Sequence, residues 1–126
     1  MKLRIKGDSL RLRVSPSEVA RLKQTGRIED TIHFSPEPEA KLTYVLEHTI
    51  TEPEISIRYR PQEVTVVLST ERFKKWAESQ QVGVQGSGDL GDAQLALLVE
   101  KDFACLDQSH PDNEDTFENP NKGKVC

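Results

Sequence analysis

The sequence predicts an α+β fold built from two copies of one hairpin–helix–hairpin unit. Three observations support this prediction. Apolar and polar residues alternate with period two in most segments, two short stretches carry helix-capping signals, and the order of segments in residues 2–49 repeats in residues 54–101. Such alternation is typical of strands with one buried face, and an internal repeat constrains the whole fold. We therefore expect a single domain in residues 1–104, followed by an irregular acidic tail in residues 105–126.

The first unit begins with two predicted strands in residues 2–14. The apolar positions of "KLRI" and "SLRLRV" alternate with polar or basic ones around a Gly-Asp-Ser turn, which predicts a hairpin with one wet face. A helix is expected over residues 15–26, because Ser15 and Glu18 fit a capping box, Pro16 suits the first helical position and Gly26 suits the C-terminal cap. Residues 27–34 and 41–49 predict a second pair of strands, joined by the Pro-rich "SPEPEA".

The second unit repeats this order with few identical residues. "EISIRYR" and "EVTVVLS" predict strands around a turn at Pro61, and a helix capped by Ser69 follows in "STERFKKWAESQ". "VGVQG" and "QLALLVEK" predict two more strands, and the Gly/Asp stretch between them reads as a flexible hairpin loop. We expect the strands to form one strongly curved antiparallel sheet or to close into an eight-stranded barrel, with two short helices covering its ends or one face.

Charge is distributed unevenly along the chain. The 126 residues include 17 Lys/Arg and 21 Asp/Glu, for a net charge of −4, and much of the acidic excess lies in residues 105–126. The body is nearly neutral, so it gives no reason to expect nucleic acid or a membrane as a partner. The charged start "MKLRIKGDSL" does not resemble a signal peptide, and two cysteines without such a signal predict a cytoplasmic protein with reduced thiols.

A set of basic residues on the predicted strands is the main candidate site. If their face of the sheet lines a groove, the guanidinium groups would converge and could hold a phosphate or carboxylate bidentately. The alternative is an ordinary wet sheet face, in which these cations pair with glutamates across the strands and each exposed pair contributes little. The seven residues of this candidate anion-binding site are Lys2, Arg4, Lys6, Arg11, Arg13, Arg58 and Arg60.

The tail carries a second candidate site, for a metal. Zinc takes about four ligands, and Cys105, His110, Asp112 and Cys126 could supply them, although the spacing C-x4-H-x15-C matches no common zinc pattern. Two alternatives stay open: Cys105 is a small buried hydrophobe at a strand end, or the two cysteines form a disulfide. A further hypothesis is that the tail folds back so that its acidic side chains cover these basic residues, which we call the basic stripe.

The predicted barrel resembles the triphosphate tunnel enzymes, whose channel binds polyphosphate with Arg/Lys and a divalent metal. Those enzymes carry an E-x-E-x-K strand near the N-terminus, whereas this chain has Lys2-x-Arg4-x-Lys6, so the metal-binding acids are missing there. The resemblance is one of coarse topology. It implies a phosphate-ester or polyphosphate-processing enzyme with a basic channel as one alternative function.

The strings "MKLRIKGDSLRLRVSPSEV", "KWAESQQVGV" and "LLVEKDFACL" resemble a family of small uncharacterised bacterial proteins, a domain of unknown function. The resemblance spans nearly the whole chain and implies no activity, cofactor or catalytic residue. The function that the sequence favours is a non-enzymatic module that binds a protein partner or a small anion. The alternatives are the phosphate-processing enzyme and a small metal-binding protein that uses the tail.

Overall fold

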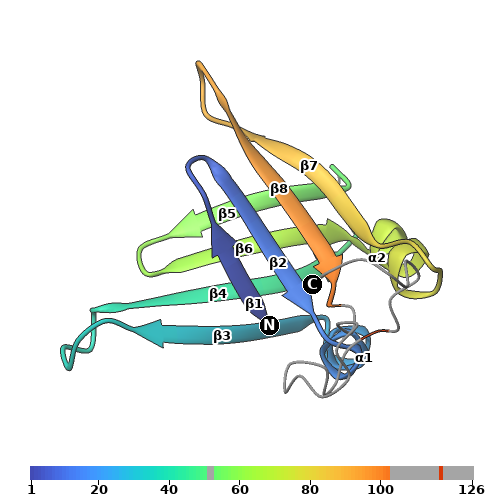
Figure 1. The fold of residues 1–126 in the computed structure, drawn as a ribbon, viewed down its shortest axis with the longest axis horizontal. Coiled ribbons are helices and arrows are strands. Elements are labelled where there is room, and N and C mark those ends of the chain that lie inside the picture. Colours follow the sequence, from blue (N-terminus) through green and yellow to red (C-terminus); the bar gives the residue numbers. More distant parts are fainter. Residues whose placement is uncertain (51–52, 103–116, 118–126) are drawn as a thin grey trace, which may run out of the picture.

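Two four-stranded β-sheets with two helices at one end make up the computed structural model (Figure 1), which describes residues 1–50, 53–102 and 117. The order hairpin, helix, hairpin occurs twice along the chain, as predicted. The elements are β1 (Lys2–Ile5), β2 (Ser9–Val14), α1 (Pro16–Thr25), β3 (Arg27–His33), β4 (Lys41–Thr49), β5 (Ile55–Arg60), β6 (Glu63–Ser69), α2 (Thr70–Ala77), β7 (Gly83–Asp89) and β8 (Gln94–Lys101).

Each sheet combines one hairpin from each half of the chain. Sheet A has the strand order β1-β2-β8-β7, and sheet B has the order β3-β4-β6-β5. Strands within a hairpin are antiparallel, but the central pairs β2–β8 and β4–β6 are parallel. The prediction of one curved antiparallel sheet or a closed barrel is therefore wrong for the described strands, which form two mixed sheets. Pairing between hairpins is a long-range choice that local alternation does not encode.

The central strands of sheet B, β4 and β6, contain consecutive apolar residues that could have indicated their parallel pairing. Val66, Val67 and Leu68 are consecutive and all buried, and so are Val45 and Leu46. A strand that is covered on both faces reads as a continuous apolar run rather than an alternating one, and such runs are typical of parallel strands inside a sheet.

One hydrophobic core lies between the sheets and under the helices. Trp76 and Phe73 of α2 and Leu22 of α1 are fully buried in it. His48 connects the two helices: its ring stacks on Phe73 with a centroid distance of 4.4 Å, and its nitrogens lie 3.2 Å from the Leu22 carbonyl oxygen and 3.0 Å from Thr70 Oγ1. Both helices therefore cover the same end of the sandwich (Figure 1).

The predicted helix caps are confirmed. The Ser15 hydroxyl accepts a hydrogen bond from the Glu18 N–H, and the Glu18 carboxylate accepts one from the Ser15 N–H at 2.9 Å, which completes the capping box. Gly26 ends α1 in the left-handed conformation with φ 80°. Ser69 caps α2 by accepting from the Arg72 N–H at 3.1 Å. These contacts satisfy backbone groups that a helix end otherwise leaves unpaired.

The strand predicted in "VGVQG" is present as β7, but it is longer than predicted and the loop before β8 is shorter. Residues 87–89, which were expected in the loop, belong to β7, and the chain turns in residues 90–93. A Cβ atom at Gly86 would overlap Cγ2 of Ile55, and one at Gly88 would lie 3.1 Å from Cγ2 of Ile57. Glycine here allows the edge of sheet A to approach β5 of sheet B closely.

Candidate anion-binding site

The structure brings five of the seven predicted cations together and separates the other two. Because Leu3, Leu10, Leu12 and Val14 pack in or against the core, the basic residues that alternate with them project from the outer face of sheet A, the face turned away from the core. This face carries Lys2, Arg4, Lys6, Arg11 and Arg13. Arg58 and Arg60 lie on β5 and project from the outer face of sheet B, so they belong to a different surface.

Two cation pairs lie directly opposite each other on the outer face of sheet A. The register of β1 and β2 places Lys2 opposite Arg13 and Arg4 opposite Arg11. Like charges in directly opposite positions destabilise an antiparallel pair. In the four described hairpins no other cross-strand partners carry the same charge.

Two acidic residues compensate this charge only in part. Glu100 of β8 lies 2.6 Å from Arg13 Nε and 3.4 Å from Arg11 Nε, and Asp102 lies 2.9 Å from Lys2 Nζ. Arg4 forms no ion pair with another described residue, and neither does Lys6. Among these five cations of sheet A, the positive charge is therefore least compensated around Arg4 and Lys6.

A cavity of about 430 Å³ lies at this end of the outer face of sheet A. We call it the basic groove. Three cations line it, and none of its lining residues within the described part of the chain is acidic. The lining residues are Arg4, Lys6, Ser9, Leu10, Arg11, Gln85, Gly86, Ala96, Leu97 and Leu98. The groove is thus a concave site that combines only partly compensated positive charge with an apolar floor.

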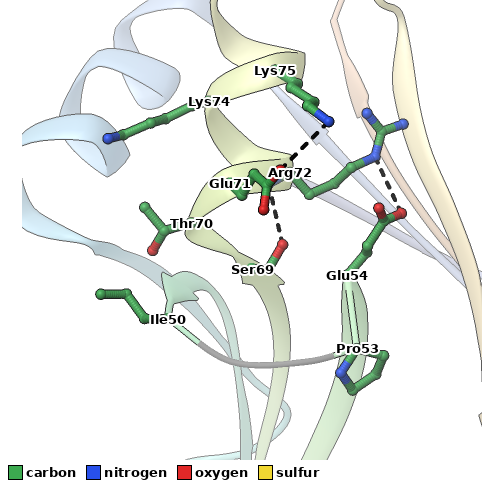
Figure 2. Close-up of a pocket in the computed structure, with 9 residues that line it drawn as sticks. All are labelled: Ile50, Pro53, Glu54, Ser69, Thr70, Glu71, Arg72, Lys74 and Lys75. Atoms are coloured by element: carbon green, nitrogen blue, oxygen red, sulfur yellow. Dashed lines mark hydrogen bonds and ion pairs between the residues drawn. The ribbon is translucent and has the colours of Figure 1, made fainter.

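A larger cavity of about 850 Å³ lies beside the N-terminal end of α2 (Figure 2), and two of its three lining cations are paired with carboxylates. Arg72 pairs with Glu54 at 3.6 Å, and Lys75 pairs with Glu71 at 3.6 Å. Figure 2 shows both pairs at the cavity wall. Lys74 has no ion pair with a described residue, but two carboxylates line this cavity whereas none lines the described part of the basic groove, so it is a weaker candidate for binding an anion.

Lys101 is a buried charged residue that the sequence reasoning did not select. It is 6% exposed, its Nζ donates to the Ser79 carbonyl oxygen at 2.6 Å, and it lies 5.9 Å from the ring centroid of Trp76 and 5.4 Å from that of Phe117. Burial lowers the pKa of this amine. The burial of Lys101 could have been predicted from the sequence, since period-two alternation places it on the same inward face of the strand as Leu97 and Val99. Its contacts indicate a structural anchor for the end of β8.

The predicted metal site lies outside the described residues. Cys105, His110 and Cys126 all fall there, as does the hypothesis that the acidic tail covers the basic stripe. Within residues 1–50, 53–102 and 117, no group of three or more His, Cys, Asp or Glu side chains is arranged to hold a metal ion. The metal site therefore stays a prediction.

Fold and surface together define a two-layer α+β sandwich with a basic groove on one sheet. None of the described helices has the length and apolar character needed to cross a membrane. The chain belongs to a family of unknown function, DUF7009, whose model matches residues 1–121. This confirms the predicted membership of a family without an assigned activity. Comparison with curated proteins and with solved structures finds no match.

Proposed function

We propose that this protein is a non-enzymatic binding module that holds a small anion in the basic groove. The observation that carries the proposal is the opposition of Arg4 and Arg11, a like-charged pair that is only partly compensated and that lines a cavity. Like-charged opposite residues cost stability in the empty protein. An anion between them would offset that cost, and two guanidinium groups can donate several hydrogen bonds to its oxygens.

Sheet B supports the proposal as an internal comparison, because it has the same arrangement of two hairpins around a parallel pair. On its outer face Arg58 lies opposite Thr65, and Arg60 lies opposite Glu63. Arg58 also pairs with Glu47 at 2.8 Å. An outer face of this architecture can therefore be built without opposing cations, which makes the pair on sheet A unusual for a purely structural surface.

The groove favours binding over catalysis. Its described lining residues include no histidine, cysteine or carboxylate that could act as a general base or nucleophile. The Ser9 hydroxyl donates to the Lys6 carbonyl oxygen at 2.7 Å, so it is engaged in the turn. A phosphate-processing enzyme also needs a channel, and the described strands form two sheets rather than a barrel. We therefore place the enzyme second to the binding module.

Titration calorimetry with inorganic phosphate at low ionic strength tests the proposal. The wild-type protein should bind phosphate, and the double variant Arg4→Gln/Arg11→Gln should lose at least about tenfold in affinity, since each charge-assisted hydrogen bond contributes about 1.5–3 kcal/mol. The matched control is Arg58→Gln/Arg60→Gln on sheet B, which should bind like the wild type. Equal loss in both double variants, or no phosphate binding by the wild type, would contradict the proposal.

We also infer that residues 2–49 and 54–101 are repeats of one unit. The registers support this: Leu12 pairs with Val99 in sheet A, and Val66 pairs with Leu46 in sheet B, at the corresponding positions of the two halves. The caps Ser15 and Ser69 also correspond. In an experimentally determined structure, superposition of the halves should align four strands and one helix in each. Failure of either hairpin to align would argue against duplication.

A further inference from the structure

We propose that the anion in the basic groove is the phosphate of a small organic phosphate monoester whose uncharged body lies across β8 towards β7. This inference rests on the proposed function and specifies the ligand class. It follows from the order in which side chains lie across the four strands on the outer face of sheet A.

One row of partners crosses the whole sheet. Arg4 of β1 is opposite Arg11 of β2, Arg11 is beside Leu98 of β8, and Leu98 is opposite Gln85 of β7. Paired residues point to the same face of a sheet, so the row reads cation, cation, apolar residue, amide. Since neighbouring strands lie about 4.8 Å apart, Gln85 lies roughly 10 Å from Arg11 along this row.

The charged end of the row suits a dianion. Arg4, Arg11 and Lys6 are three cations at one end of the groove. A phosphate monoester carries a charge of about −1.5 to −2 at neutral pH and has three acceptor oxygens. Guanidinium forks match these oxygens bidentately. A monocarboxylate would leave more of this charge uncompensated, so we expect it to bind more weakly.

The rest of the row suits an uncharged organic body. Leu98 and Ala96 form an apolar floor, and the exposed Gln85 offers an amide at the far wall. No further cation follows Arg11 in the row, so a polyphosphate or a nucleic acid strand would find no continuous track of positive charge. The cavity of about 430 Å³ lies within the range of roughly 300–1,000 Å³ that small-molecule sites occupy.

Calorimetry with two probes, inorganic phosphate and phenyl phosphate, tests the inference on the intact chain. Phenyl phosphate should bind about tenfold more tightly to the wild type, the gain expected from burying on the order of 60 Å² of apolar surface. In Leu98→Ala the difference between the probes should shrink at least about threefold, while inorganic phosphate binds as before. Leu90→Ala, an exposed leucine outside the groove, should leave both affinities unchanged and serves as the control.

The outcomes separate this inference from the proposed function. If inorganic phosphate and phenyl phosphate bind equally to the wild type, the groove holds an anion but does not recognise an organic body, and the inference is overturned alone. If Leu98→Ala keeps the full preference for phenyl phosphate, the body lies elsewhere and the inference is likewise overturned. If neither probe binds, the proposed function fails and the inference fails with it.

Discussion

At the scale of single residues, the opposition of Arg4 and Arg11 links stability to binding. The two side chains leave the same face of neighbouring antiparallel strands, and among the described residues only Arg11 of the two has a carboxylate partner, Glu100 at 3.4 Å. The empty groove therefore contains a repulsion between like charges, which would be absent if either residue were neutral or acidic. Binding sites often contain residues that lower the stability of the free protein, because the arrangement that binds the ligand best differs from the most stable one.

The variant Arg4→Glu should raise stability and abolish phosphate binding. A glutamate opposite Arg11 replaces a like-charged pair with an opposite-charged one, for which we expect a gain of up to about 1 kcal/mol in the free energy of unfolding. Urea unfolding at low salt measures the gain, and calorimetry measures the loss of binding. The control is Arg58→Glu, which removes the ion pair with Glu47 and should not gain stability. A destabilised Arg4→Glu protein would show that Arg4 has a structural role that our account lacks.

Glu18 is the residue for which the structure predicts a pH dependence. Burial acts to raise its pKa, but a hydrogen bond from the Met1 amino group, the charge of that group and hydrogen bonds from Ser15 outweigh burial and hold the pKa below its usual value of 4.5. A carboxylate whose pKa is lowered by folding stabilises the fold above its unfolded pKa. That contribution is lost as the pH falls through the folded pKa.

The variant Glu18→Gln should therefore lose about 1 kcal/mol in the free energy of unfolding at neutral pH, through the lost ion pair with the Met1 amino group, because a glutamine at this position can still accept the Ser15 N–H and keep the capping box. The difference between variant and wild type should shrink as the pH falls below about 4. Urea unfolding from neutral to acidic pH measures it. Glu39→Gln, at an exposed glutamate without an ion pair among the described residues, should show neither effect. A difference that stays constant with pH would rule out the ionised carboxylate as its source.

At the scale of elements, β7 shows how glycine sets the distance between the two sheets. Gly86→Ala should destabilise the protein by about 1–3 kcal/mol, because the new methyl group overlaps Ile55 in a packed edge. Gly88→Ala is the matched comparison: its methyl group lies 3.1 Å from Ile57, which is only half-buried, so the cost should be smaller. Thermal unfolding of both variants checks the order, and a larger loss at Gly88 would contradict the packing at this edge.

The helices and most strands could be predicted from the sequence because their signals are local. Ser15, Glu18 and Gly26 define α1 within a few residues of chain, and alternation identifies the hairpin of β1 and β2 with its basic outer face. The extension of β7 through Gly88, inside the stretch predicted as a loop, could not be predicted in this way. It places Gly88 against Ile57, which is distant in sequence and comes close only after the sheets have formed.

At the scale of the whole molecule, the arrangement of the strands depends on how the hairpins pair with one another, which the sequence pattern does not predict. Period-two alternation states which face of a strand is buried but not which hairpin lies beside it, so the joining of β2 to β8 and of β4 to β6 was unforeseen. That pairing also divides the predicted site. It carries Arg58 to the outer face of sheet B, whereas the hairpin of β1 and β2 keeps Arg4 and Arg11 together on sheet A. The grouping of five of the seven predicted cations thus follows from a local hairpin, and their separation from Arg58 and Arg60 follows from the topology of the sheets.

The most direct test of the central claim, that the basic groove on sheet A binds an anion, is a titration of the isotopically labelled protein with inorganic phosphate, followed by backbone amide chemical shifts. Our account predicts saturable shifts concentrated in Arg4, Lys6, Ser9, Arg11, Gln85, Ala96 and Leu98, with the outer face of sheet B unchanged. Shifts spread over both sheets, or concentrated around α2, would contradict it.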